Sequence, residues 1–400
     1  MFLTREEEMM LEGKCGRASA LAMRLLVALG QIFDAERMVA INSAQISGIS
    51  YKNIGNTGLE FLENFANLGA QICVRTNLNP AGMDLDKWKE FGISRSFAEK
   101  QLRIINAFRK MNIQSSCSCT PYLIGNRPRF GDHIAWAESS AVAYANSILG
   151  ARTNREGGPS ALASAIIGKT PLYGYHLDEN RKPTYVVRVE IPVQGAFEYS
   201  ILGYIVGKKL GYGVPLVTGI RKKPTFEELK AFSASIATVG SIALYHIPGI
   251  TPECQVVSEK NEASKETFFV EKSDFQQVID ILYQVDTFDL VAIGCPHCTL
   301  SEISKLAKMV RGKKLRRSVW AYTSREVYAA AERRGLVTII EKAGGKVVKD
   351  TCMVVSPLED MDIKTVATNS CKAAHYLPTT CKVKIYLGSL DTCVEVALKQ

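Results

Sequence analysis

The amino-acid sequence predicts an α/β protein with layered, mainly parallel sheets. Short apolar runs typical of buried strands alternate with helical patterns along the 400 residues, and this alternation favours parallel pairing. Hydrophobic residues make up 46% and charged residues 22% of the chain, which are ordinary globular values that exclude collagen-like, disordered and coiled-coil proteins. Neither an internal repeat nor a low-complexity linker interrupts the pattern.

The first two thirds of the chain open with a helix signal. Thr4 and Glu7 have the spacing of a capping box, in which a hydroxyl and a carboxylate satisfy free N–H groups at a helix start. Further helices are expected over 59–68, 97–111, 157–167 and 226–239. Strands are expected over 72–75, 113–119, 185–191 and 241–246.

The last third carries the clearest pattern. A continuous apolar strand is expected over 288–293, followed by Cys295-Pro296-His297-Cys298 and a helix that starts at Thr299-Leu300-Ser301-Glu302. We then expect a helix over 324–334 and strands over 337–340 and 346–348. The second of these strands ends near Cys352.

The net charge and the lack of targeting signals limit the kinds of partner that the sequence predicts. The longest apolar stretch is broken by Arg24, so it does not reach the length of a membrane-spanning helix. The acidic start of the chain is unlike a secretory signal peptide, which has a basic start followed by an apolar run. We therefore expect a cytoplasmic protein without a membrane partner. The net charge of +9 favours anionic ligands, but no aromatic-interleaved basic motif accompanies it, so a nucleic-acid partner is not expected.

Three cysteines stand out among the eleven. Cys119, Cys295 and Cys352 each lie near the expected carboxyl end of a strand, where open α/β sheets place their ligands. Thiolates from separated segments hold iron–sulfur clusters, which usually take four cysteines. Three protein ligands leave one iron open to act as a Lewis acid on a substrate oxygen.

The same residue types support other interpretations. Cys117 and Cys119 together with Cys295 and Cys298 would make a four-thiolate zinc site. The motif Cys295-Pro296-His297-Cys298 also matches a thiol–disulfide exchange site. Buried structural thiols are a further alternative, because free cysteine packs as a small hydrophobe. The five histidines show no metal-ligand spacing, and each is expected to be a hydrogen-bonded polar residue.

Two polar stretches predict anion binding. Arg152 and Arg155 precede the helix start Gly157-Gly158-Pro159-Ser160, and arginine forks and helix N-termini both bind carboxylate or phosphate. The alternative is a salt-bridged turn beside an ordinary helix cap. The second stretch, Thr368-Asn369-Ser370-Cys371-Lys372, offers hydroxyl, amide and ammonium donors to a substrate, or else serves as a polar cap.

The chain resembles the catalytic large component of the aconitase X family. This resemblance spans nearly the whole chain, and the stretch from Arg152 to Ser160 is its most specific part. It is carried by Ser47-Gly48-Ile49-Ser50-Tyr51, Asn79-Pro80-Ala81-Gly82-Met83-Asp84, Cys119-Thr120-Pro121-Tyr122, Ala135-Trp136-Ala137-Glu138-Ser139-Ser140-Ala141-Val142, Ala151-Arg152-Thr153-Asn154-Arg155-Glu156-Gly157-Gly158-Pro159-Ser160, Gly294-Cys295-Pro296-His297 and Asp350-Thr351-Cys352.

The resemblance implies an aconitase-like, multi-layer α/β catalytic body, with approximate subdomains at 1–180, 181–280 and 281–400. By this resemblance, the catalytic body lacks the swivelling domain of aconitases. That domain is expected on a separate small subunit, in a heterodimer or heterotetramer. The implied cofactor is an iron–sulfur cluster, of 4Fe-4S type with one open iron, held by Cys119, Cys295 and Cys352.

The implied activity is that of a hydro-lyase acting on a small phosphorylated hydroxy acid. Some family members convert mevalonate 5-phosphate to trans-anhydromevalonate 5-phosphate in an archaeal-type isoprenoid pathway, and others dehydrate cis-3-hydroxyproline. Thr120 after Cys119 favours the first type. The catalytic base is not identified, and a serine on the small subunit is one candidate.

The resemblance also assigns expected roles to side chains around the cluster. Anion binding is expected of Arg152, Arg155 and Lys372. Orientation of substrate hydroxyl and carboxylate groups is expected of Ser47, Asn154 and Ser370, and Asn79 is a further expected substrate-binding residue. Glu138 and Glu156 are expected to hold the arginines in place rather than act as acids.

Overall fold

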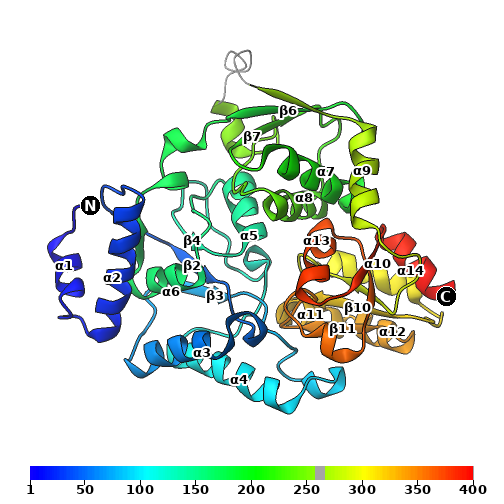
Figure 1. Cartoon of the computed structure of the whole chain (residues 1–400), viewed down its shortest axis with the longest axis horizontal. Helices are drawn as coiled ribbons and strands as arrows, with labels where there is room; N and C mark the ends of the chain where they lie inside the picture. Colours follow the sequence, from blue (N-terminus) through cyan, green and yellow to red (C-terminus); the bar gives the residue numbers. More distant parts are fainter. Residues whose placement is uncertain (257–265, 400) are drawn as a thin grey trace.

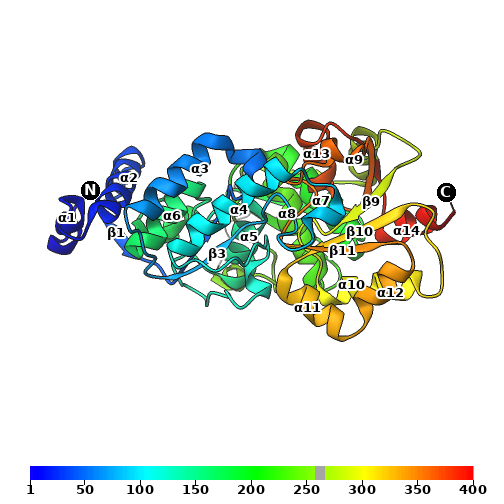
Figure 2. The ribbon, with the colours of Figure 1, turned by 90° about the horizontal axis from the view of Figure 1, so that it is seen from below.

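Three parallel sheets follow one another along the chain in the computed structural model, which describes residues 1–256 and 266–399 (Figure 1). The N- and C-termini lie at opposite ends of the molecule in both views (Figure 2). The prediction of an α/β fold with mainly parallel sheets is confirmed, with one small antiparallel pair, β1 (Met38–Ala40) and β5 (Lys169–Pro171). Within the described ranges, no helix combines the length and apolar character needed to cross a bilayer.

The first sheet has the strand order β3-β2-β4, all parallel. Every residue of β2 is buried, as expected for a parallel strand covered on both faces. The strands are β2 (Ser43–Ile46), β3 (Arg75–Leu78) and β4 (Ala135–Trp136). The helices of this part are α1 (Arg5–Leu11), α2 (Arg17–Ile32), α3 (Tyr51–Asn67), α4 (Arg95–Lys110), α5 (Ser139–Tyr144) and α6 (Gly158–Ile167).

The second sheet, β7-β6-β8, lies against the helix pair α7 and α8 in the upper part of Figure 1. Glycines let these helices approach closely, since a Cβ on Gly203 would meet the carbonyl oxygen of Phe232 at 2.6 Å. The elements are β6 (Tyr185–Val189), β7 (Pro215–Thr218), β8 (Thr267–Val270), α7 (Gly195–Leu210), α8 (Phe226–Val239) and α9 (Lys272–Leu282).

The third sheet has five parallel strands in the order β11-β10-β9-β12-β13. The chain winds outward from β9 in one direction and then returns to β12 on its other side, so the order reverses between β9 and β12. Ligands bind at such switch points, outside the carboxyl ends of the strands. The strands are β9 (Leu290–Ile293), β10 (Ser318–Thr323), β11 (Lys346–Lys349), β12 (Thr365–Thr368) and β13 (Lys384–Leu387).

Helices cover both faces of this sheet. The predicted start of α10 is confirmed, because the Thr299 hydroxyl and the Glu302 carboxylate form the expected capping box. The helices are α10 (Leu300–Val310), α11 (Arg325–Arg333), α12 (Leu336–Lys342), α13 (Cys371–Thr380) and α14 (Leu390–Lys399).

Several expected strands are wrong or displaced. The range 337–340 belongs to helix α12, and 241–246 is irregular apart from one bridge between His246 and Leu216. The strand expected over 72–75 begins at Arg75 and continues to Leu78. The range 113–119 forms no strand, but the Ser118 N–H donates to the carbonyl of Leu78 at 2.8 Å, so Cys119 still lies at the carboxyl end of β3.

Candidate active site

A cavity of about 330 Å³ is lined by residues from the parts of the chain that hold the first and third sheets. Residues separated by up to 333 positions line it together, which only the tertiary fold can arrange. Its chemistry-bearing wall consists of Ser47, Asn79, Cys119, Glu138, Arg155, Cys295, Cys352, Lys372 and Tyr376. A smaller cavity of about 20 Å³ touches Cys295 from the side of Ser200, Lys230 and Ser370.

Three cysteines reach the larger cavity from the ends of different strands. Cys295 follows β9, Cys352 follows β11, and Cys119 follows Ser118, whose N–H bonds the carbonyl of the last β3 residue, Leu78. Burial and, to a smaller extent, the nearby Cys295 raise the pKa of Cys352 to about 12. Burial also raises the pKa of Cys119, with additional contributions from Glu138 and Cys352. Each thiol therefore needs a cationic group to become a thiolate.

In the part of the chain that the structure describes, no three cysteines lie close enough together to hold a single metal ion. Among the described residues, the one trio of acidic, thiol or imidazole ligand atoms within 4.8 Å of one another is Asp84, Asp86 and Asp350. Arg325 already pairs with two of these carboxylates. Four thiolates at about 2.3 Å from one zinc ion would form a tighter group than any set of cysteines makes here.

One buried polar atom points the same way. The hydroxyl of Tyr122, three residues after Cys119, is buried and has no hydrogen-bond partner in the described chain. Buried polar groups without partners are rare in native proteins, and they often mark a bound group or water. The donor set of three soft thiols is the set that iron–sulfur clusters use.

The geometry does not support thiol–disulfide exchange at Cys295 and Cys298. Cys298 is 2% exposed, packs in the apolar core of the third sheet and does not line the larger cavity. Burial raises the pKa of Cys298, whereas exchange needs an accessible thiol with a lowered pKa.

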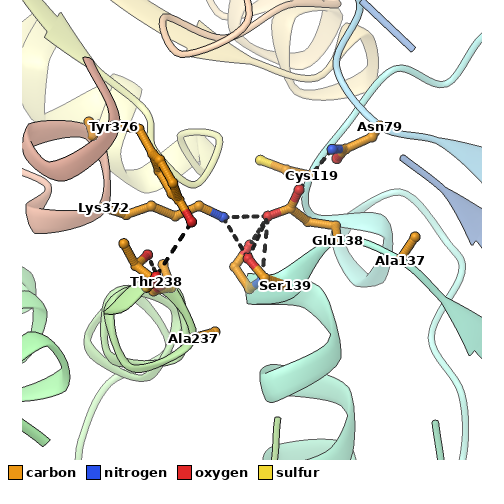
Figure 3. A network of polar contacts seen from close by, with 12 residues as sticks. Asn79, Cys119, Ala137, Glu138, Ser139, Ala237, Thr238, Lys372 and Tyr376 are labelled. Atoms are coloured by element: carbon orange, nitrogen blue, oxygen red, sulfur yellow. Dashed lines mark hydrogen bonds and ion pairs between the residues drawn. The ribbon is translucent and has the colours of Figure 1, made fainter. Parts of the chain in front are cut away.

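Lys372 and Glu138 form a buried ion pair inside the cavity (Figure 3). Lys372, in the first turn of α13, also donates to the hydroxyl of Ser139 at 3.1 Å. Glu138 caps α5 and accepts from the Asn79 amide at 2.7 Å and the Ser140 hydroxyl at 3.0 Å. The pair therefore links the end of the first sheet, which carries Asn79 and Glu138, to helix α13 beside the third sheet.

Both members of this pair are ionised at neutral pH. Burial raises the pKa of Glu138, but Lys372 and the hydrogen bonds outweigh burial and lower it to about 2. Burial lowers the pKa of Lys372, but Glu138 and Cys295 outweigh this effect and raise it above its usual value. Lys372 is consequently a persistent cation that can hydrogen-bond an anion but releases its proton poorly, and Glu138 is a poor base.

Gln45 fixes this corner of the site. Its buried amide donates to the Asn79 side chain at 3.2 Å and accepts from the backbone N–H of Glu138 at 2.8 Å. Because Gln45 lies on β2, between β3 and β4, one side chain sets the positions of both neighbours.

The structure brings together most of the residues singled out in the sequence. Ser370 caps α13 and hydrogen-bonds Cys295 from the smaller cavity. Seven further predicted cluster or substrate residues line the larger cavity: Ser47, Asn79, Cys119, Arg155, Cys295, Cys352 and Lys372.

Arg152 and Asn154 do not line the cavity. The Arg152 side chain donates to the carbonyl of His176 at 3.3 Å and pairs with Asp178. The Asn154 amide holds the loop at Tyr173 and Tyr175 through bonds of 3.0 and 2.9 Å. Both side chains therefore contact the segment after β5 instead of the cavity.

The expectation that Glu138 and Glu156 hold the arginines is wrong. Glu138 pairs with Lys372 instead. Glu156 accepts hydrogen bonds from Ser160 at 2.6 Å and Thr170 at 3.3 Å, which tie the start of α6 to β5. Burial raises the pKa of Glu156.

Sequence reasoning missed Tyr376, which lines the larger cavity, and Lys230, which lines the smaller one. Tyr376 lies one turn after Lys372 on α13, so helical spacing was the available signal. Figure 3 shows its hydroxyl directed to the carbonyl of Thr238, at 3.5 Å. Lys230 gives no sequence signal, because its buried position depends on the packing of α8 against the third sheet.

Family comparisons match the chain over nearly its whole length. The models for the aconitase X first, second and third domains match residues 1–179, 183–280 and 288–399. This chain belongs to the aconitase X family. The crystal structure of Thermococcus kodakaraensis aconitase X in its holo-form is 45% identical and superimposes with a TM-score of 0.92, covering 99% of this chain and 100% of that one.

Curated members of the aconitase X family include two kinds of relative. The phosphomevalonate dehydratase large subunit of Methanocaldococcus jannaschii is 52% identical, with 98% of each chain covered. The corresponding large subunit of Methanothermobacter thermautotrophicus is 49% identical, with 95% of each covered. The cis-3-hydroxy-L-proline dehydratase of Pseudomonas aeruginosa is 34% identical, with 98% of this chain but 69% of that protein covered.

Proposed function

We propose that this chain is the large subunit of a hydro-lyase that converts mevalonate 5-phosphate to trans-anhydromevalonate 5-phosphate. The observation that carries the proposal is the end-to-end match to phosphomevalonate dehydratase large subunits at about half identity. The alternative function is hydroxyproline dehydration, because a cis-3-hydroxy-L-proline dehydratase is 34% identical to this chain. The match covers only 69% of that protein, however.

The proposed cofactor is an iron–sulfur cluster of 4Fe-4S type held by Cys119, Cys295 and Cys352. When bound, a cluster with one incompletely ligated iron supplies a Lewis acid for the hydroxyl group that leaves. The shared cavity of the three thiols and the absence of any tighter thiol group among the described residues support this choice over zinc.

The cavity wall offers donors for both anionic ends of the substrate. Arg155 uses one N–H on the carbonyl of Ala237 at 3.3 Å, which leaves the rest of its fork for a phosphate or carboxylate. Glu138 fixes the ammonium group of Lys372. This ammonium group binds a negatively charged oxygen of the substrate close to Cys295. Ser47 and Asn79 complete the wall as neutral hydrogen-bonding groups.

The proton acceptor is proposed to come from the partner subunit. Among the described residues that line the cavity, Glu138 is the one carboxylate, and its pKa of about 2 makes it a weak base. The lining contains no histidine within the same residues. A serine of a small swivel-domain subunit, in a heterodimer or heterotetramer, is our candidate. We place the complex in the cytoplasm.

Anaerobic co-purification with the small subunit tests this function. We expect turnover of mevalonate 5-phosphate by the complex, no turnover of cis-3-hydroxyproline, and no turnover by the large chain alone. The product is identified by NMR. Activity on hydroxyproline with rejection of the phosphorylated acid would reverse the substrate assignment, and full activity without a partner would remove the two-subunit claim.

A further inference from the structure

His297 joins the three segments that carry the cavity cysteines. It is fully buried, two residues after Cys295. Its backbone N–H donates to the sulfur of Cys119 at 3.2 Å. Its ring contacts the hydroxyl of Ser118 through Nδ1 at 3.2 Å and the carbonyl of Thr351 through Nε2 at 2.9 Å. Ser118 directly precedes Cys119, and Thr351 directly precedes Cys352.

The hydrogen bonds fix the tautomer of this imidazole. The carbonyl of Thr351 can only accept, so Nε2 carries the proton. Nδ1 then accepts from the Ser118 hydroxyl, whose oxygen accepts in turn from the backbone N–H of Thr120 at 3.2 Å. Nε2 therefore acts as the donor and Nδ1 as the acceptor. Rotation of the ring would break its bonds to two cysteine-bearing segments at once.

Lys230 anchors the same residue from the second sheet layer. Its buried ammonium donates to the carbonyl of His297 at 2.9 Å and to Glu302 at 2.5 Å. Burial lowers the pKa of Lys230, but Glu302 and nearby thiols outweigh burial and raise it, so the cation persists. His297 therefore contacts all three parts of the chain, through Ser118, Lys230 and Thr351.

We propose that His297 is a positioning residue that holds Cys119, Cys295 and Cys352 at the spacing their cofactor needs. Groups behind metal ligands orient those ligands, and hydrogen bonds to cluster sulfurs tune their properties. The backbone N–H to Cys119 favours the thiolate, and the ring keeps the other two loops in register with it. This inference rests on the iron–sulfur site proposed above.

Iron retention tests this role. The complex with His297→Phe, which fills the space without polar atoms, is expected to lose iron to a chelator about tenfold faster than the wild-type complex. His297→Gln restores an amide donor and acceptor and is expected to recover part of the retention. His375→Phe is the matched control, because that imidazole bonds Tyr204 at 3.2 Å rather than a cysteine-bearing loop.

A milder variant covers the case in which His297→Phe does not fold. Ser118→Ala removes the hydroxyl that bonds Nδ1, and we expect faster iron loss and an altered EPR spectrum with unchanged far-UV circular dichroism. If His297→Gln and Ser118→Ala both retain iron at the wild-type rate with the wild-type spectrum, the positioning role is wrong. If the wild-type complex binds no iron, the proposed function itself fails.

Discussion

Lys372 donates to the carboxylate of Glu138 inside the cavity that also exposes three thiols. A buried charge is costly unless it is paired, so removal of either partner leaves the other unsatisfied. The pair therefore stabilises the fold at the site and keeps an ammonium beside the cysteines.

Glu138→Gln is expected to destabilise the chain by about 3 kcal/mol at neutral pH, because Lys372 loses its counter-charge. The folded-state pKa of Glu138, about 2, lies below its ordinary value of 4.5. Its stabilisation is thus complete above about pH 5 and is lost as pH falls through the folded-state value. Calorimetry should show a melting difference from wild type at pH 7 that shrinks by pH 3. A difference that stays constant between these pH values would contradict the ionised pair.

Cys295→Ser should remove bound iron and turnover together. Cys298→Ser is the matched control, because Cys298 is buried in the core of the third sheet and does not reach the larger cavity. Iron and sulfide analysis of both complexes after anaerobic purification gives the comparison. Equal iron loss in both variants would instead indicate a site that uses both thiols of the motif.

Arg155→Ala should weaken substrate binding, because Arg155 lines the cavity. Loss of a charge-assisted hydrogen bond of about 1.5–3 kcal/mol corresponds to a KM about 10–150 times higher, with iron content unchanged. Arg152→Ala should change KM far less, since that side chain pairs with Asp178 outside the cavity. Steady-state kinetics with both variants measures this contrast, and the reverse order of effects would return Arg152 to the substrate site.

Gly203→Ala should lower stability although alanine favours helices. Its Cβ would meet the carbonyl oxygen of Phe232 at 2.6 Å and the backbone nitrogen of Ile236 at 3.1 Å, so α7 and α8 must separate. Overpacking of this kind typically costs about 1–3 kcal/mol. Lys208→Ala, at an exposed position of the same helix, is the control in thermal unfolding. An equal melting temperature for Gly203→Ala and wild type would show that the helices tolerate the wider spacing.

Local pattern predicted the elements in which one strong signal dominates. The apolar run before Cys295 gave β9, and the Thr299 and Glu302 capping box gave the start of α10. The β-branched range 337–340 was expected to be a strand, yet it lies in α12. There Leu336, Val337 and Ile340 share a buried helical face, so tertiary packing overrides residue preference.

The candidate site was predictable where a residue directly follows a strand. The sequence analysis placed Cys295 near such an end, and the switch between β9 and β12 brings it into one cavity with Lys372. The side-chain ion pairs were not predictable from the sequence, because Glu138 pairs with Lys372, 234 positions away, and Arg152 pairs with Asp178 outside the cavity. The subdomain boundaries and the roles of individual substrate residues stay predictions.

Mössbauer spectroscopy of the anaerobically purified complex tests the central claim most directly. Three cysteine ligands on a cluster of four irons predict one iron whose signal differs from the other three and shifts when mevalonate 5-phosphate is added. Four equivalent irons that ignore the substrate, or zinc in place of iron, would contradict the account.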